Sequence, residues 1–183
     1  MSPQSHSIGL AVPPEPTDHL EGSQHARVTL VEYGDFECPS CKVAVTTPKL
    51  LLERFPNKIR FIYRHFPLEE AHPHALPAAE VAEAAAAQGK FWRMHDVLFQ
   101  NQTHLKDKDL YRYAAELGLD MARYKAEMDD HIYLQKVREH VEGARRSHIR
   151  ATPTFFVDGV VQDISFCMKA LHDAVASAVA RSG

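Results

Sequence analysis

Short apolar runs and longer amphipathic stretches divide the chain into predicted strands and helices. Residues 27–33 are mainly β-branched or aromatic, which is typical of a strand buried in a sheet. Residues 58–66 mix aromatic and aliphatic side chains with arginines and predict a second strand. Between them, Pro39 suits the first turn of a helix that extends to about Arg54, and Pro48 should kink that helix. Strand, helix and strand together predict a βαβ unit.

The middle of the chain has a helical pattern almost throughout. Alanine-rich and amphipathic segments follow one another from Pro73 to about His148, and Gly89 and Gly118 stand at expected helix ends. The predicted helices are residues 78–88, 91–100, 107–117, 120–128 and 133–147.

The last part of the chain returns to strands and closes with a helix. The predicted strands 154–157 and 160–161 are separated by an Asp-Gly pair, which favours a tight antiparallel hairpin. Residues 165–180 have the apolar stripe of a helix that covers a sheet. Cys167 shares a face of this predicted helix with Leu171, so we expect a buried thiol there.

These elements predict four consecutive parts. Residues 1–25 contain several prolines and predict an N-terminal arm, because proline denies backbone donors to regular structure. Residues 26–66 hold the βαβ unit, residues 67–148 a helical insert, and residues 149–183 the hairpin with the last helix. With 183 residues and 45% hydrophobic content, the chain is long enough to bury a full core.

Charge and targeting signals exclude several classes of protein. The formal net charge of −3 gives no basic excess that would bind nucleic acid or anionic lipid. No apolar run reaches the roughly 20 residues that cross a bilayer, and the N-terminus lacks a basic start followed by an apolar stretch. We therefore expect a soluble cytoplasmic protein, or a periplasmic or other extracytoplasmic one if a leader has been removed.

Two of the three cysteines carry the candidate chemistry. Cys38 and Cys41 are separated by Pro39 and Ser40 and lie where the first strand gives way to the helix. A thiol at a helix N-terminus has a lowered pKa and becomes a nucleophile near neutral pH. Cys38 is therefore the expected attacking residue, and Cys41 is expected to resolve the mixed disulfide. Neither Pro39 nor Ser40 adds a charge that would stabilise a thiolate as a histidine would.

Other roles for the two cysteines fit less well. A zinc site needs four ligands, and Cys167 has no partner at ligand spacing. The histidines His65, His72 and His74 are too loosely arranged to predict a metal site. A purely structural disulfide that closes so short a loop would remove little entropy from the unfolded chain.

Three segments, taken in order, carry a resemblance to a known family. Residues 28–41 end in Phe-Glu-Cys-Pro-Ser-Cys, residues 91–96 read Phe-Trp-Arg-Met-His-Asp, and residues 151–159 read Ala-Thr-Pro-Thr-Phe-Phe-Val-Asp-Gly. From about residue 19 to the end, the chain resembles the thioredoxin superfamily, and more closely its DsbA-like bacterial branch. The resemblance implies an α/β thioredoxin-like fold with an inserted helical subdomain.

The resemblance also implies roles for individual residues. A cis Thr152–Pro153 bond would lie against Cys38 and help to present a backbone edge to the segment around the substrate cysteine. The Thr152 hydroxyl would modulate the redox potential. Together with Pro39 and Ser40 between the cysteines, these residues form the expected substrate-binding and redox-tuning set.

We therefore expect a protein-disulfide oxidoreductase that acts on cysteine-bearing proteins or small thiols. No metal and no separate cofactor is expected, and glutathione or a thioredoxin-type reductant is a candidate electron partner. In a reducing cytosol the cysteine pair should be mainly dithiol, which favours reduction or isomerisation. Two alternatives stay open: a glutathione-dependent transferase or isomerase on the same fold, and a non-catalytic binding or chaperone module that keeps the motif.

Overall fold

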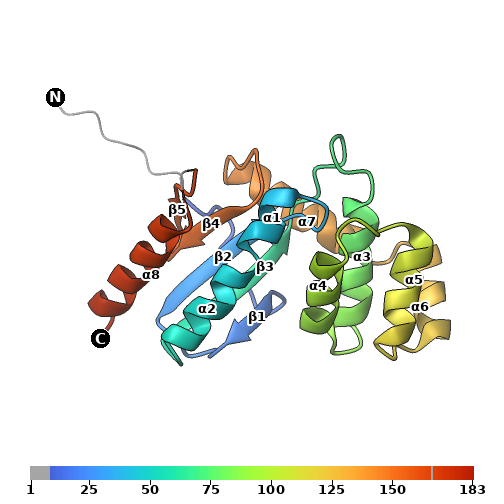
Figure 1. Cartoon of the computed structure of the whole chain (residues 1–183), viewed down its shortest axis with the longest axis horizontal. Helices are drawn as coiled ribbons and strands as arrows, with labels where there is room; N and C mark the ends of the chain where they lie inside the picture. Colours follow the sequence, from blue (N-terminus) through green and yellow to red (C-terminus); the bar gives the residue numbers. More distant parts are fainter. Residues whose placement is uncertain (1–8, 166) are drawn as a thin grey trace. The chain divides into compact units, whose positions relative to one another are not determined.

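The structure, a computed structural model, describes residues 9–165 and 167–183 (Figure 1). The chain divides into two compact units. One unit contains the described residues up to Tyr33 together with Thr46–Arg64 and the described residues of Gly143–Gly183. The other contains Gly34–Val45 and His65–Glu142.

A five-stranded sheet is the centre of the first unit. Its strand order is β1-β3-β2-β4-β5, and β1 with β3, β2 with β4, and β4 with β5 are antiparallel pairs. Val28 N–H donates to the Lys58 carbonyl and Phe66 N–H donates to the Gly34 carbonyl, so β2 and β3 run in the same direction. The strands are β1 His19–Gly22, β2 Val28–Gly34, β3 Ile59–His65, β4 Thr154–Val157 and β5 Val160–Gln162.

The sequence pattern accounts for the central strands and for the hairpin. Every residue of β2 is buried, as expected for an apolar strand covered on both faces. The hairpin between β4 and β5 turns at Asp158 and Gly159, which have φ angles of 49° and 80°. A two-residue turn with positive φ at both positions matches the right-handed twist of the flanking strands. The predicted strands and hairpin are therefore confirmed.

The predicted helix from Pro39 to about Arg54 is split in two. Helix α1 covers Pro39–Ala44 and helix α2 covers Thr46–Arg54, with a break at Val45. Pro48 explains the break, because it has no N–H to donate to the carbonyl of Ala44. The disruption expected at this proline is thus confirmed.

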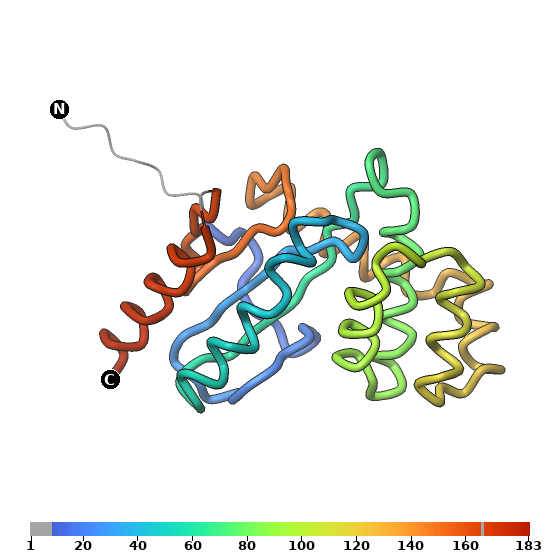
Figure 2. Tube along the Cα trace, viewed as in Figure 1, coloured from blue at the N-terminus to red at the C-terminus, as the bar shows by residue number. Residues whose placement is uncertain are grey.

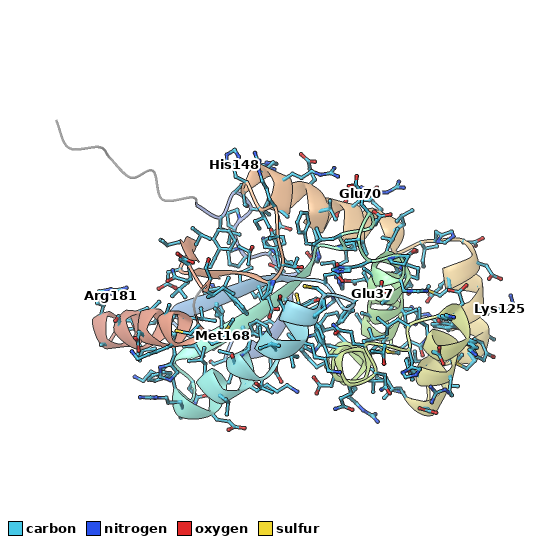
Figure 3. The ribbon with its side chains drawn as sticks, turned by 45° about the horizontal axis from the view of Figure 1, so that its top comes forward. Glu37, Glu70, Lys125, His148, Met168 and Arg181 are labelled. Carbon is cyan, nitrogen blue, oxygen red and sulfur yellow. The ribbon has the colours of Figure 1, made fainter. Side chains whose placement is uncertain are left out.

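The last helix begins later than its pattern predicted. Helix α8 covers Lys169–Arg181 and packs against α2, β4 and β5. Met168, labelled in Figure 3, is its N-cap residue, so Cys167 lies outside the helix and is exposed. The expected buried thiol at Cys167 is wrong, because the apolar stripe that enters the core starts only at Leu171.

Much of the predicted N-terminal arm belongs to the first unit. Residues 19–22 form β1, and the guanidinium of buried Arg64 holds the segment before it. Arg64 donates to both carboxylate oxygens of Asp18 at 2.8 and 2.7 Å, and to the carbonyls of Val12 and Pro13 at 2.7 and 2.8 Å. It also donates to the Tyr33 hydroxyl at 3.0 Å. Arg64 thus provides hydrogen-bond donors for backbone carbonyls of the proline-rich segment, which is not part of the sheet.

The second unit is largely helical (Figure 2). Its alanine-rich helix α3 contacts α4, α5 and α6, because small side chains let helices approach closely. Within the described part of the chain, no helix is both long and apolar enough to cross a membrane. The helices are α3 Ala75–Ala86, α4 Phe91–Gln100, α5 Asp107–Glu116, α6 Met121–Asp129 and α7 Leu134–Arg146, the last of which ends in the first unit.

Candidate redox site

The two cysteines of the motif stand one turn apart at the start of α1. Cys38 is the N-cap residue, with extended backbone angles, and Pro39 takes the first helical position. Cys38 keeps 6% of its surface exposed and Cys41 keeps none, whereas Pro39 and Ser40 between them are exposed. This order of exposure suits a Cys38 that meets a substrate first and a Cys41 that reacts from behind it.

The turn that leads into Cys38 is held by backbone hydrogen bonds and by a buried glutamine. Cys38 N–H donates to the Asp35 carbonyl at 3.2 Å. The Gln102 side chain, which follows α4, donates from Nε2 to the Phe36 carbonyl at 2.9 Å and to the Cys38 carbonyl at 2.8 Å. The backbone of the candidate nucleophile is therefore fixed by a residue far away in the sequence.

Replacing Gln102 with leucine should destabilise the protein by about 2 kcal/mol, because two buried carbonyls would lose their donor. Chemical denaturation of both proteins measures this difference. Gln88→Leu is the matched control, since Gln88 makes its two hydrogen bonds to Asp120 at an exposed position. Equal losses for Gln102→Leu and Gln88→Leu would contradict the bracing role of Gln102.

The ring of Phe36 anchors the same turn to α4. Phe36 is buried, and its ring centroid lies 5.0 Å from that of Phe99 and 5.8 Å from that of His95. Rings at these separations, tilted toward one another, contribute beyond the area they bury. Helix α4 thus supports the active turn both through the Phe36 ring and through the Gln102 hydrogen bonds that follow it.

Asp35, three residues before Cys38, is the centre of a buried polar network. Its side chain is completely buried, and one carboxylate oxygen accepts from Glu37 N–H at 2.7 Å. The other oxygen accepts from Leu68 N–H at 2.9 Å and lies 2.7 Å from His72 Nδ1. The loop after β3 is therefore tied to the segment that carries Cys38.

His72 has a perturbed protonation equilibrium. Burial lowers its pKa, but the hydrogen bond to Asp35 and the negative charges of Asp35, Cys38 and Glu37 outweigh burial, so the pKa of His72 is raised. The hydrogen bond to Asp35 places the His72 imidazole beside the turn that leads into Cys38.

A second carboxylate–histidine pair lies beside the first. Glu37, labelled in Figure 3, accepts from His74 N–H at 2.6 Å and lies 2.8 Å from His74 Nδ1. The side chains of Glu37 and His74 are 20% and 35% exposed, against 0% and 18% for Asp35 and His72. This pair is therefore more strongly screened by solvent.

Sequence reasoning did not assign the two histidines a role. Their loop has no periodicity, so nothing local indicated that His72 and His74 meet Asp35 and Glu37, each 37 residues away. The only available signal was the position of the loop directly after a strand of the βαβ unit.

Thr152 and Pro153 precede β4 in the first unit. Their peptide bond is cis, as the resemblance implied. Thr152 is buried and Pro153 half-buried, and the Thr154 hydroxyl donates to the Ala151 carbonyl at 2.8 Å across the loop. The roles predicted for Thr152 and Pro153, and for Pro39 and Ser40, stay predictions.

Comparisons with solved structures define the class of fold. BdbD from Bacillus subtilis matches with a TM-score of 0.82 and 22% identity, over 94% of this chain and 98% of that one. Wolbachia pipientis alpha-DsbA1 matches with a TM-score of 0.77 and 22% identity, over 92% and 94%. A thioredoxin-like oxidoreductase from Silicibacter pomeroyi DSS-3 matches with a TM-score of 0.76 and 29% identity, over 92% and 95%. The fold is thus the thioredoxin-like fold of DsbA-like proteins, with a helical insert.

The family follows from the sequence match. A family model described as thioredoxin matches residues 14–176. The chain therefore belongs to the thioredoxin family.

The curated relatives are named as Na(+)/H(+) antiporters. Na(+)/H(+) antiporter NhaA 1 of Salinispora arenicola is 47% identical over 174 residues, which are 94% of this chain and 26% of that protein. Na(+)/H(+) antiporter NhaA of Herminiimonas arsenicoxydans is 43% identical over 142 residues, 78% of this chain and 22% of that protein. The chain spans about a quarter of the length of these relatives.

Proposed function

We propose that the protein exchanges disulfides with cysteine-bearing proteins or small thiols through Cys38, and that Cys41 resolves the mixed disulfide. The observation that carries the proposal is the arrangement of the pair in a thioredoxin-family chain. Cys38 is the N-cap of α1 and keeps 6% of its surface exposed, and Cys41 is completely buried one turn further along.

The reaction balances without any added group. In the reducing direction, the Cys38 thiolate attacks one sulfur of a substrate disulfide, the substrate S–S bond breaks, and a mixed disulfide and a substrate thiolate result. Cys41, once deprotonated, then attacks the Cys38 sulfur and releases the second substrate thiolate. Two electrons pass to the substrate, and Cys38 and Cys41 end as a disulfide. The oxidising direction is the reverse.

The equilibrium reduction potential of the pair, measured against glutathione, tests this function and its direction. A value near that of thioredoxin, about −270 mV, indicates a reductase, and a value near about −120 mV indicates an oxidant. Cys38→Ser is the control and should show no two-electron equilibrium. Absence of a redox-active pair in the unmodified protein would overturn the proposal.

The compartment decides which direction prevails in the cell. The cytoplasmic location expected from the sequence stays a prediction. In that compartment the glutathione pool would keep the pair as dithiol, so we propose that the protein there reduces or isomerises its substrates. The candidate electron donors are glutathione and a thioredoxin-type protein.

A further inference from the structure

The charged groups near Cys38 do not belong to the two residues between the cysteines. Pro39 and Ser40 supply none. The charged residues just before Cys38 are the acidic Asp35 and Glu37. Negative groups near a thiol oppose formation of its thiolate. Beyond the N-terminus of α1, a positive charge that favours the Cys38 thiolate would therefore have to come from outside the motif.

The loop after β3 places a histidine beside the turn that leads into Cys38. His72 Nδ1 lies 2.7 Å from the fully buried carboxylate of Asp35, whose backbone carbonyl accepts from Cys38 N–H. The same carboxylate accepts from Leu68 N–H, so it fixes the loop as well as the ring. The position of the imidazole beside the turn of Cys38 thus depends on one buried residue.

We propose that protonated His72, held by Asp35, stabilises the thiolate of Cys38. His72 thereby replaces, from a separate loop, the charge that a histidine between the cysteines would supply. The inference rests on the proposed function and names the residue that tunes it. Asp35 acts through His72 and is a positioning residue.

The protonation state of His72 fits this role. Its raised pKa keeps the ring charged to higher pH than an ordinary histidine, and Asp35, Cys38 and Glu37 are the negative groups that raise it. Because the coupling is mutual, a thiolate that favours the imidazolium is itself favoured by it. As pH rises through the pKa of His72, the ring loses its charge and the stabilisation is lost.

His74, two residues after His72, is an internal control for the experiment. His74 Nδ1 lies 2.8 Å from a carboxylate oxygen of Glu37, as His72 Nδ1 lies 2.7 Å from one of Asp35, but the side chains of His74 and Glu37 are more exposed. Solvent screening should make its effect on Cys38 small. The two histidines therefore both pair with a carboxylate and lie two residues apart in the same loop.

The ultraviolet absorbance of the thiolate, followed against pH, tests the inference directly. The titration uses the full chain with Cys41→Ser and Cys167→Ser, so that Cys38 is the cysteine observed. His72→Gln should lower the thiolate-to-thiol ratio of Cys38 about tenfold at a given pH. His74→Gln should leave the titration nearly unchanged. Identical titrations for His72→Gln and its parent would overturn the inference.

Two further variants separate charge from structure. His72→Lys keeps a positive charge and should restore most of the thiolate, whereas a purely structural role would predict no rescue. Asp35→Asn with His72→Gln removes both charges and should titrate between the parent and His72→Gln. Failure of His72→Lys to raise the thiolate fraction above that of His72→Gln, in folded proteins with matching circular dichroism spectra, would also overturn the inference.

The same change should appear in the reduction potential, measured with both redox cysteines present. A tenfold loss of thiolate in the reduced form corresponds to a potential lower by about 30 mV. Failure of this inference is distinguishable from failure of the proposed function. If the cysteine pair is redox-active but Cys38 titrates identically with and without His72, only the inference is overturned. If the chain has no redox-active pair, the proposed function is overturned.

Discussion

Cys38→Ser should reduce disulfide exchange to the uncatalysed rate. Only a thiolate attacks a disulfide at a useful rate, and Cys41 is fully buried, so it cannot replace Cys38 at the surface. Reduction of insulin disulfides by dithiothreitol, followed by turbidity, measures the loss. The control is Cys167→Ser, which removes an exposed thiol outside the site and should keep the full rate.

Cys41→Ser should give a different result from Cys38→Ser. Cys38 can still attack, but the mixed disulfide is no longer resolved from within the protein, so the adduct with a substrate thiol should accumulate. Intact-mass measurement detects it. Sustained glutathione-dependent turnover in Cys41→Ser would instead favour the transferase or isomerase alternative. Unchanged activity in the Cys38→Ser, Cys41→Ser double variant would favour a binding or chaperone module.

Arg64→Met should be the most destabilising single substitution considered for the first unit. It removes five hydrogen bonds and leaves the buried carboxylate of Asp18 without its counter-charge. Breaking a buried ion pair on one side costs about 3–5 kcal/mol. Urea unfolding of the wild type and the variant measures the difference in the free energy of unfolding.

A double variant shows whether the lost charge balance is the cause. Replacing both partners, in Arg64→Met with Asp18→Leu, should recover part of the stability, because no buried charge then stays uncompensated. Arg123→Met is the surface control, since Arg123 pairs with Glu127 one turn away on an exposed helix face, and it should change stability little. A loss for Arg64→Met no larger than that for Arg123→Met would contradict the role given to the buried pair.

Local patterns in the sequence were sufficient for most of the fold. The apolar run before Gly34 predicts a strand covered on both faces, and every residue of β2 is buried. The pair Asp158-Gly159 predicts a hairpin because its residues tolerate positive φ. Pro48 predicts a disrupted helix because it cannot donate to Ala44. Each of these predictions depends on a few neighbouring residues, so no knowledge of distant contacts was needed.

Predictions failed where distant contacts decide the outcome. The start of α8 depends on which residues reach the sheet, and this placed Cys167 in the exposed segment before the helix. The N-terminal residues have the composition of an arm, yet Arg64 fixes Asp18 at a separation of 46 residues. The composition of a segment is a local property, whereas its burial depends on contacts with residues far away in the sequence.

The sequence by itself determined the redox motif: two cysteines at the start of a helix, after a buried strand, in a chain of thioredoxin-like order. Only the tertiary structure decided the electrostatic surroundings of Cys38. His72 and Asp35 are 37 residues apart and meet because β3 returns the chain beside the end of β2. The reason is physical: covalent neighbours fix local geometry, but Coulomb interactions and hydrogen bonds depend on distance in space, which only the folded chain sets.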